Sequence, residues 1–410
     1  MRGVCFTVMW PFYVYGFLSS VMLDQFVWMV YLVRRGYSTS DVGLAILSFG
    51  AAYVACSVPS SYLSDRAGRR QFLVWGPCFK IVSAFLFMDA RSLGVVLAGA
   101  AFAGVAFAVI ADTDHACLHD VLLSRGLEQH VNDRLSRFAA TQVLGNTLGG
   151  LLGGLLARAS YQRLYCAEAG VSALAAAVGF LVPTVPVSWM RGRSGGGVAH
   201  HATGARTALR AITGQGPRFV GFLALTVASW TVYGLGRDLI QPVMAIHDID
   251  PAVIAAVFTA GGLFTIAGRR IAGHLDAHER VSGFVLHMIP FATATMAVGI
   301  LGTAGRRPGL TWVLAMAASL AFGRLVCSFS GHVQEVWLLG HAPAGMKATT
   351  LSLAGSATIL INGICFYLLG LASMQHGVST PLFVLGVACM GLHVLWQKWL
   401  RGVATGVPEA

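Results

Sequence analysis

Five charged residues lie inside long apolar stretches of the 410-residue chain, where a charge is difficult to accommodate: Asp24, Lys80, Arg237, Asp238 and Arg324. An ionisable side chain in hydrocarbon costs about 2.5–3.5 kcal/mol or more, so such residues are functional candidates by default. A carboxylate that burial and a movable cation can switch between its charged and neutral forms is what a proton carrier needs. These residue types therefore indicate proton uptake and release within a membrane.

The partners of these charges are open at this stage. Asp24 is expected to carry the proton, with Arg324 or Lys80 as its cation. Lys80 fits a structural ion pair between helices as well as it fits a functional role. Arg237 and Asp238 could neutralise one another, but adjacent helical residues point about 100° apart, so separate partners are expected.

The elements that carry these charges are membrane spans. Hydrophobic residues make up 56% of the chain and charged residues only 11%, against about 25% charged in a soluble domain. The net charge of +11 comes without a dense basic stretch, which excludes nucleic-acid binding. Stretches of about 20 apolar residues can cross a bilayer. Twelve are expected, at 6–33, 41–62, 71–89, 92–114, 138–158, 164–187, 218–246, 251–273, 281–303, 309–339, 347–372 and 380–400.

A polar break at 188–217 divides the spans six and six, which predicts an N-terminal transmembrane half over 1–187, a cytoplasmic linker, and a C-terminal half over 218–410. With the N-terminus inside, 18 of the 28 Lys and Arg residues fall in inner segments and seven in outer ones. The positive-inside rule then predicts a multi-pass cell-membrane (inner-membrane) protein with both termini in the cytoplasm.

A weak internal repeat relates the two halves. Asp24 precedes Asp65 by 41 positions, and Asp238 precedes Asp276 by 38. The expected fold is thus an all-α integral membrane protein of 12 transmembrane helices in two pseudo-symmetric six-helix bundles, as in many transporters. Asp24 and Asp238 occupy equivalent places in the two halves.

The loop between the second and third spans reads Ser61-Tyr62-Leu63-Ser64-Asp65-Arg66-Ala67-Gly68-Arg69-Arg70. It resembles motif A of the major facilitator superfamily, G-x-L-x-D-R-x-G-R-[RK], with Ser in place of the first Gly. Gly68 would permit a tight turn. Asp65 can sit at a helix N-terminus, and Arg66, Arg69 and Arg70 would face the cytoplasm.

Three further stretches resemble the same superfamily. Gly145, Gly149, Gly150, Gly153 and Gly154 resemble motif C of its drug-antiporter branch, although Gly150 replaces the motif's Pro and Ser136 its first Gly. Their four-residue spacing also predicts a bare helix-packing face. Residues 114–120 resemble the D-x-A-x-L-x-D stretch of efflux-like members, which implies that Asp114 or Asp120 pairs with Arg66 or Arg69 as a conformational latch. Lys347 opens a stretch resembling RAT-x-LS.

The resemblance implies that spans one, four, seven and ten line a central cavity. Aromatic residues on spans one and seven are then expected to face a bulky, partly apolar substrate: Tyr13, Phe17, Trp28, Trp230 and Tyr233. Proton-coupled export of a drug or secondary metabolite by alternating access is the expected function, with antibiotic resistance as a consequence. The small-molecule substrate, protons and the lipid bilayer are its expected partners, and the protein is expected to be a monomer.

Two alternatives to export are open, and the second belongs to another class of protein. An importer of a small polar nutrient would share motif A. A membrane acyltransferase would use His115 and Asp120, which have H-x4-D spacing. No phosphate-binding G-x4-G-K-[ST] loop occurs, because Ala348 follows Lys347. ATP-driven transport by this chain alone is therefore not expected, and energy should come from an ion gradient or from the substrate's own gradient. No residue spacing suggests a metal site, and we expect no cofactor and no enzymatic activity.

Overall fold

The computed structural model describes residues 2–110, 113–127, 130–185, 214–274, 310–341, 347–376 and 380–404, which form α-helices joined by turns. In chain order the helices are α1 (Arg2–Ser20), α2 (Trp28–Arg34), α3 (Thr39–Ala67), α4 (Arg69–Asp89), α5 (Leu93–Ile110), α6 (Thr113–Ser124), α7 (Val131–Ala159), α8 (Tyr161–Leu181), α11 (Pro217–Ile246), α12 (Pro251–His274), α14 (Leu310–His341), α15 (Lys347–His376) and α16 (Thr380–Ala404).

These helices confirm the all-helical membrane fold. They overlap the predicted spans except 281–303, which lies outside the described residues, as does most of the predicted linker 188–217. Seven described helical stretches are long and apolar enough to cross a bilayer, among them Arg69–Asp89, Tyr161–Leu181 and Pro217–Ile246.

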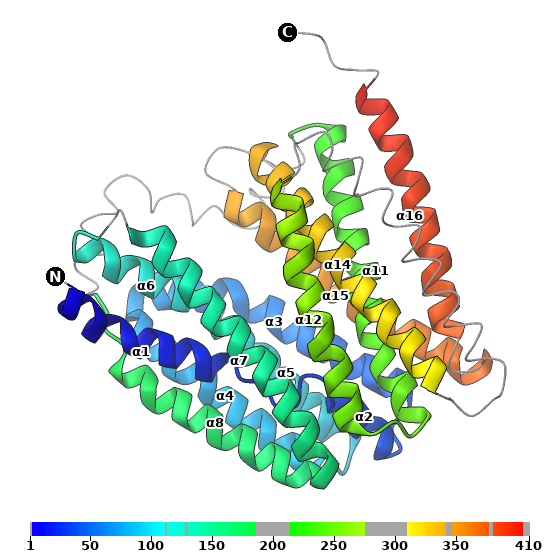
Figure 1. The fold of residues 1–410 in the computed structure, drawn as a ribbon, viewed down its shortest axis with the longest axis horizontal. Helices are drawn as coiled ribbons and strands as arrows, with labels where there is room; N and C mark the ends of the chain where they lie inside the picture. The colour runs from blue at the N-terminus through cyan, green and yellow to red at the C-terminus, as the bar shows by residue number, and fades with distance from the viewer. Residues whose placement is uncertain are drawn as a thin grey trace. The chain divides into compact units, whose positions relative to one another are not determined.

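The chain forms two compact units. Unit 1 comprises Met1–Tyr31, Leu44–Ala199 and Asp250–Ala256, and unit 2 comprises Leu32–Gly43, His200–Ile249 and Val257–Ala410. In unit 1, α1 packs along α7 and α8, and α4 packs along α5 and α8 (Figure 1). In unit 2, α11 packs against α14, α15 and α16.

Helix α7 has one face that packs against protein and another that is exposed. Gly149 and Gly153 face the residues between α1 and α2 so closely that an added Cβ would collide with them. Four leucines of α7 near these glycines are exposed, and they give the helix an apolar outer face suited to lipid: Leu144, Leu148, Leu152 and Leu155. Small residues let helix backbones approach where the hydrophobic effect cannot drive association.

The expectation of one continuous first span over 6–33 is wrong. Helix α1 ends at Ser20 and α2 begins at Trp28, so the seven residues between them leave the helix. The carbonyl of Asp24 accepts hydrogen bonds from the N–H groups of Val27 and Trp28, both at 2.8 Å, which closes a turn that starts α2. Asp favours such turns over the helix interior, and here its polar side chain coincides with the break.

The expectation that Asp65 begins a helix is also wrong. Helix α3 continues through motif A to Ala67, which places Asp65 in its last turn. Gly68 alone separates α3 from α4, with a φ of 97°. Because L side chains rarely adopt this backbone conformation, glycine is required at the turn. The turn is so tight that no helix can begin before Arg69.

Candidate functional site

The break in the first span leaves polar backbone groups that must be satisfied inside the protein. The last carbonyls of a helix have no partner within it, and no water is available in the bilayer core to replace one. Val21 and Leu23, which flank the turn, are both buried. The residues that satisfy these groups therefore decide whether the break can exist.

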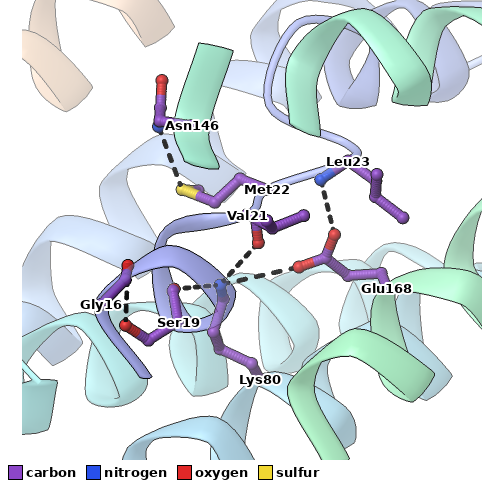
Figure 2. Close-up of polar contacts among 8 residues, drawn as sticks. All are labelled: Gly16, Ser19, Val21, Met22, Leu23, Lys80, Asn146 and Glu168. Atoms are coloured by element: carbon purple, nitrogen blue, oxygen red, sulfur yellow. Dashed lines mark hydrogen bonds and ion pairs between the residues drawn. The ribbon is translucent and has the colours of Figure 1, made fainter. Parts of the chain in front are cut away.

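Lys80 of α4 and Glu168 of α8 provide these partners (Figure 2). The Lys80 Nζ donates to the carbonyl oxygens of Ser19 at 3.1 Å and Val21 at 3.3 Å. It also forms an ion pair with Glu168 Oε1 at 3.6 Å. The other oxygen of Glu168, Oε2, accepts the N–H of Leu23 at 2.6 Å. One ammonium and one carboxylate thus satisfy backbone groups at the end of α1 and in the first residues of the break.

Both charged groups are deeply buried, since the side chains of Lys80 and Glu168 are 10% and 6% exposed. Removing one member of such a pair is costly because the other charge then remains buried and uncompensated. Sequence reasoning missed Glu168. The available signal was a lone acidic residue near the start of an apolar span, opposite the intramembrane Lys80 whose partner was unassigned.

Asp24 lies within the break itself and is partly buried. None of the described residues forms an ion pair with its carboxylate, although the charges of Glu168 and Lys80 both act on it. Lys80 is engaged by Glu168 and by backbone carbonyls. The region around the break therefore holds two carboxylates and one ammonium.

An aromatic cluster lies beside this region. Tyr165 stacks on Phe87 with centroids 5.8 Å apart, and Tyr31 meets Tyr165 edge-on at 5.3 Å. Trp28, a predicted substrate-cavity residue, lies edge-on to Phe87 at 6.2 Å. The Tyr165 hydroxyl is buried without a hydrogen-bond partner among the described residues, and the charges of Asp24 and Glu168 reach it.

The glycines of α7 lie against the same break. A Cβ at Gly145 would meet the backbone of Phe17, and one at Gly149 would meet Met22. A Cβ at Gly153 would collide with the carbonyl of Leu23. On the adjoining face, Gly150 meets the Phe26 ring and Gly154 meets Ala255 at the start of α12. The predicted packing stripe thus lies against the interrupted part of the first span.

Motif A joins α4 to α6. Arg69 Nε lies 3.0 Å from Asp120 Oδ2, which is one of the pairings that the sequence resemblance implies. Arg70 Nη2 donates to the Val182 carbonyl at 3.3 Å. Asp65 and Arg66 belong to the last turn of α3, and their side chains lie outside the described part of the structure.

The side chains of Asp114 and His115 each contact the same glutamine of α7. Gln142 Nε2 donates to Asp114 Oδ2 at 2.7 Å, and Gln142 Oε1 lies 2.9 Å from His115 Nε2. The ring of His115 also meets Phe138 edge-on at 5.0 Å. The two residues of the acyltransferase alternative thus contact different partners, since Asp120 pairs with Arg69.

In unit 2, Arg237 and Asp238 bind one another, contrary to the expectation of separate partners. Arg237 Nε and Nη2 lie 2.6 and 3.0 Å from the two carboxylate oxygens. The long arginine side chain reaches the carboxylate of its neighbour, and a bidentate interaction stabilises that conformation. Asn362 Nδ2 lies 3.5 Å from Asp238 Oδ2, and Arg324 packs beside Gly261.

The remaining predicted substrate residues lie in different surroundings. Tyr13 packs on a buried cluster around Phe12 and Phe138, and Phe17 lies against α7. Tyr233 is buried, and the Trp230 indole nitrogen faces Gly331. No group of three or more His, Cys, Asp or Glu residues suited to a metal ion occurs within the described ranges.

The family model of the Major Facilitator Superfamily matches residues 4–336, which is well over half of the sequence. The chain therefore belongs to this superfamily. It is a multi-pass membrane protein and a secondary transporter of a small molecule, and the family consists of transporters, not enzymes, which sets aside the acyltransferase interpretation. No curated protein matches the sequence.

Solved structures share this fold. A mutant of the nucleoside transporter NupG has a TM-score of 0.76 at 12% identity, covering 96% of this chain and 99% of that one. A POT family transporter in complex with 5-aminolevulinic acid has a TM-score of 0.68 at 12% identity, covering 97% and 96%. The inward-open xylose transporter XylE from E. coli has a TM-score of 0.68 at 14% identity, covering 96% and 96%. At these identities the likeness concerns the fold.

Proposed function

We propose that the protein is a proton-coupled exporter of a small organic compound, such as a drug or secondary metabolite, that works by alternating access. The observation that carries this proposal is the charge balance at the break in the first span. Lys80 compensates Glu168 at 3.6 Å, and Asp24 adds a second carboxylate whose charge the same groups influence. One bound proton makes the three groups neutral.

Asp24 is the group that takes this proton. Both carboxylate oxygens of Glu168 already have partners, the ammonium of Lys80 at 3.6 Å and the Leu23 N–H at 2.6 Å. Asp24 has no ion-pair partner among the described residues. Its position in an interrupted helix also places it where a repeat-based transporter binds its coupling ions.

Export of an aromatic or partly apolar compound is supported by two features. The glycine stretch of α7 resembles that of the antiporter branch, and Trp28 extends the aromatic cluster that lies next to Asp24's charge. We further propose that both termini face the cytoplasm, that a cytoplasmic linker over 188–217 joins an N-terminal half over 1–187 to a C-terminal half over 218–410, and that the protein acts as a monomer in the cell membrane.

Import of a small polar nutrient is the second candidate, and the interior of unit 2 favours it. Asp238, Gln241, Gln334 and Asn362 are all buried, and Asn362 contacts Asp238. Such groups can orient a polar substrate. The similar solved structures of nucleoside, peptide and xylose transporters supply compounds with which to test this alternative.

The two candidates predict opposite directions of movement in efflux-deficient bacteria that express the protein. Cells are loaded with ethidium and a panel of aromatic antibiotics, and a parallel set receives labelled uridine, a dipeptide and xylose. An exporter lowers accumulation of a compound in the first set, and an uncoupler abolishes that effect. Raised uptake in the second set, with no effect on the first, would replace export by import.

The Asp24→Asn variant tests the proton site directly. It should lose gradient-driven transport while retaining exchange of labelled for unlabelled substrate in proteoliposomes, because an amide cannot carry the proton. Asp89→Asn is the matched control, since Asp89 is half exposed and pairs with the exposed Arg91. Full pH-driven transport by Asp24→Asn would exclude Asp24 as the coupling site.

A further inference from the structure

The Lys80 ammonium of α4 lies among three oxygen atoms that come from two segments, the end of α1 with the residues after it and α8. The carbonyls of Ser19 and Val21 lie 3.1 and 3.3 Å from Nζ, and Glu168 Oε1 lies 3.6 Å away. Figure 2 shows the nitrogen between these three oxygens. All four residues are buried. These oxygen-bearing residues, Ser19, Val21 and Glu168, form what we call the oxygen cage.

The donor set of the oxygen cage is that of an alkali-metal site. Hard cations prefer carbonyl and carboxylate oxygens, and unwound helix ends in transporters coordinate Na⁺ through backbone carbonyls. The C-terminal end of α1 adds its partial negative charge. The single charge of Lys80 matches a monovalent ion, and the Leu23 N–H fixes Glu168 through its other oxygen at 2.6 Å.

We propose that the oxygen cage is a monovalent-cation site which this chain fills with its own lysine ammonium. Lys80 thereby does the work of a bound sodium ion, and it makes that position independent of external sodium. A chain that lacks the ammonium but keeps the oxygens binds Na⁺ there. The carbonyls need to close by roughly 1 Å to reach metal–oxygen distances, which the non-helical residues after Ser20 permit.

This inference goes beyond proton coupling and holds whichever group carries the coupling proton. Its test therefore measures binding and thermal stability, not transport. Lys80→Ala removes the ammonium and leaves space, whereas Lys80→Met removes the charge and keeps the space filled. Lys80→Ala with Glu168→Gln removes the cage's only carboxylate as well.

The full-length protein is purified in detergent and melted in NaCl, KCl or choline chloride at equal ionic strength, and binding of radioactive sodium is measured in parallel. Wild type should melt at the same temperature in all three salts and bind no sodium above background. Lys80→Ala should melt lower in choline chloride, recover saturably by about 2 °C or more in NaCl, and bind one sodium per chain.

Lys80→Met and the double variant should show neither the recovery nor sodium binding, and Lys398→Ala, which removes an exposed lysine of α16, should behave as wild type. Equal sodium effects in Lys80→Ala and the double variant would overturn the site. So would absence of sodium binding by folded Lys80→Ala. If Lys80→Ala fails to fold in NaCl while Lys80→Met folds there, the cage does not accept the ion and the proposal is wrong.

Discussion

Charge compensation at the break in the first span depends on single residues. Lys80 has three oxygen partners, and Glu168 has both an ion partner and a backbone N–H. Each of the two is therefore needed by the other and by the backbone between α1 and α2. Their mutual dependence can be measured separately from transport.

A double-mutant cycle of Lys80→Met and Glu168→Gln is expected to show strong coupling. Lys80→Met should destabilise the fold by about 3–5 kcal/mol, because Glu168 stays buried without its cation. The double variant should recover more than half of that loss, since glutamine is neutral and its Oε1 can still accept the Leu23 N–H. Thermal melting in detergent, at one salt composition throughout, provides the comparison.

Additive losses in the cycle would show that the two side chains act independently and would contradict the assigned pair. The exposed pair Arg91 and Asp89, at 2.8 Å, is a suitable reference. Its side chains are 82% and 50% exposed, and surface ion pairs contribute little. A cycle there should show almost no coupling.

Sequence reasoning identified the charged residues within the spans better than it identified their interaction partners. Asp24 and Lys80 were recognisable because each interrupts an apolar stretch. Glu168 was not, because a charge four residues inside a predicted span is easily taken for a boundary residue. The choice of Glu168 over Asp24 as the partner of Lys80 depends on which helices pack together, and no local pattern encodes that. Arg237 pairs with the adjacent Asp238 because its long side chain is flexible. The angle between neighbouring residues on a helix does not take that flexibility into account.

At the scale of helices, the glycine face of α7 packs closely against the interrupted first span. Glycine spacing predicted a packing face but could not say which helix meets it. The break itself was missed, because 6–33 reads as one apolar stretch with a single acidic residue. Tertiary contacts stabilise the break. Lys80 and Glu168 satisfy the freed backbone groups, and the absence of a side chain at Gly153 leaves space for the Leu23 carbonyl.

Gly153→Ala should therefore destabilise the protein by about 1–3 kcal/mol, because the added methyl collides with backbone that cannot move aside easily. Gly170→Ala on α8 is the matched control, since nothing lies within 4 Å of its added Cβ. That change should be neutral or stabilise the helix by about 0.5–1 kcal/mol. Melting temperatures of the two variants in the same detergent distinguish them, and equal melting temperatures would contradict the close packing of α7 on the first span.

At the scale of the whole molecule, the uneven distribution of Lys and Arg predicts which loops face the cytoplasm. In a cysteine-free background, Ser92→Cys between α4 and α5 should react with a membrane-impermeant maleimide on intact cells. Arg125→Cys after α6 should react only after permeabilisation. Both positions are exposed, so accessibility within the protein does not limit labelling. The reverse pattern would invert the proposed topology.

The long sequence separation of the groups that hold the break has a consequence during translation. Leu23 and Glu168 are 145 residues apart, which at about 5–20 residues per second corresponds to roughly 7–30 s of synthesis. The ribosome thus delivers the first span well before the carboxylate that completes it. A nascent chain that stops before Glu168 therefore leaves Lys80 without the carboxylate that pairs with it in the folded protein.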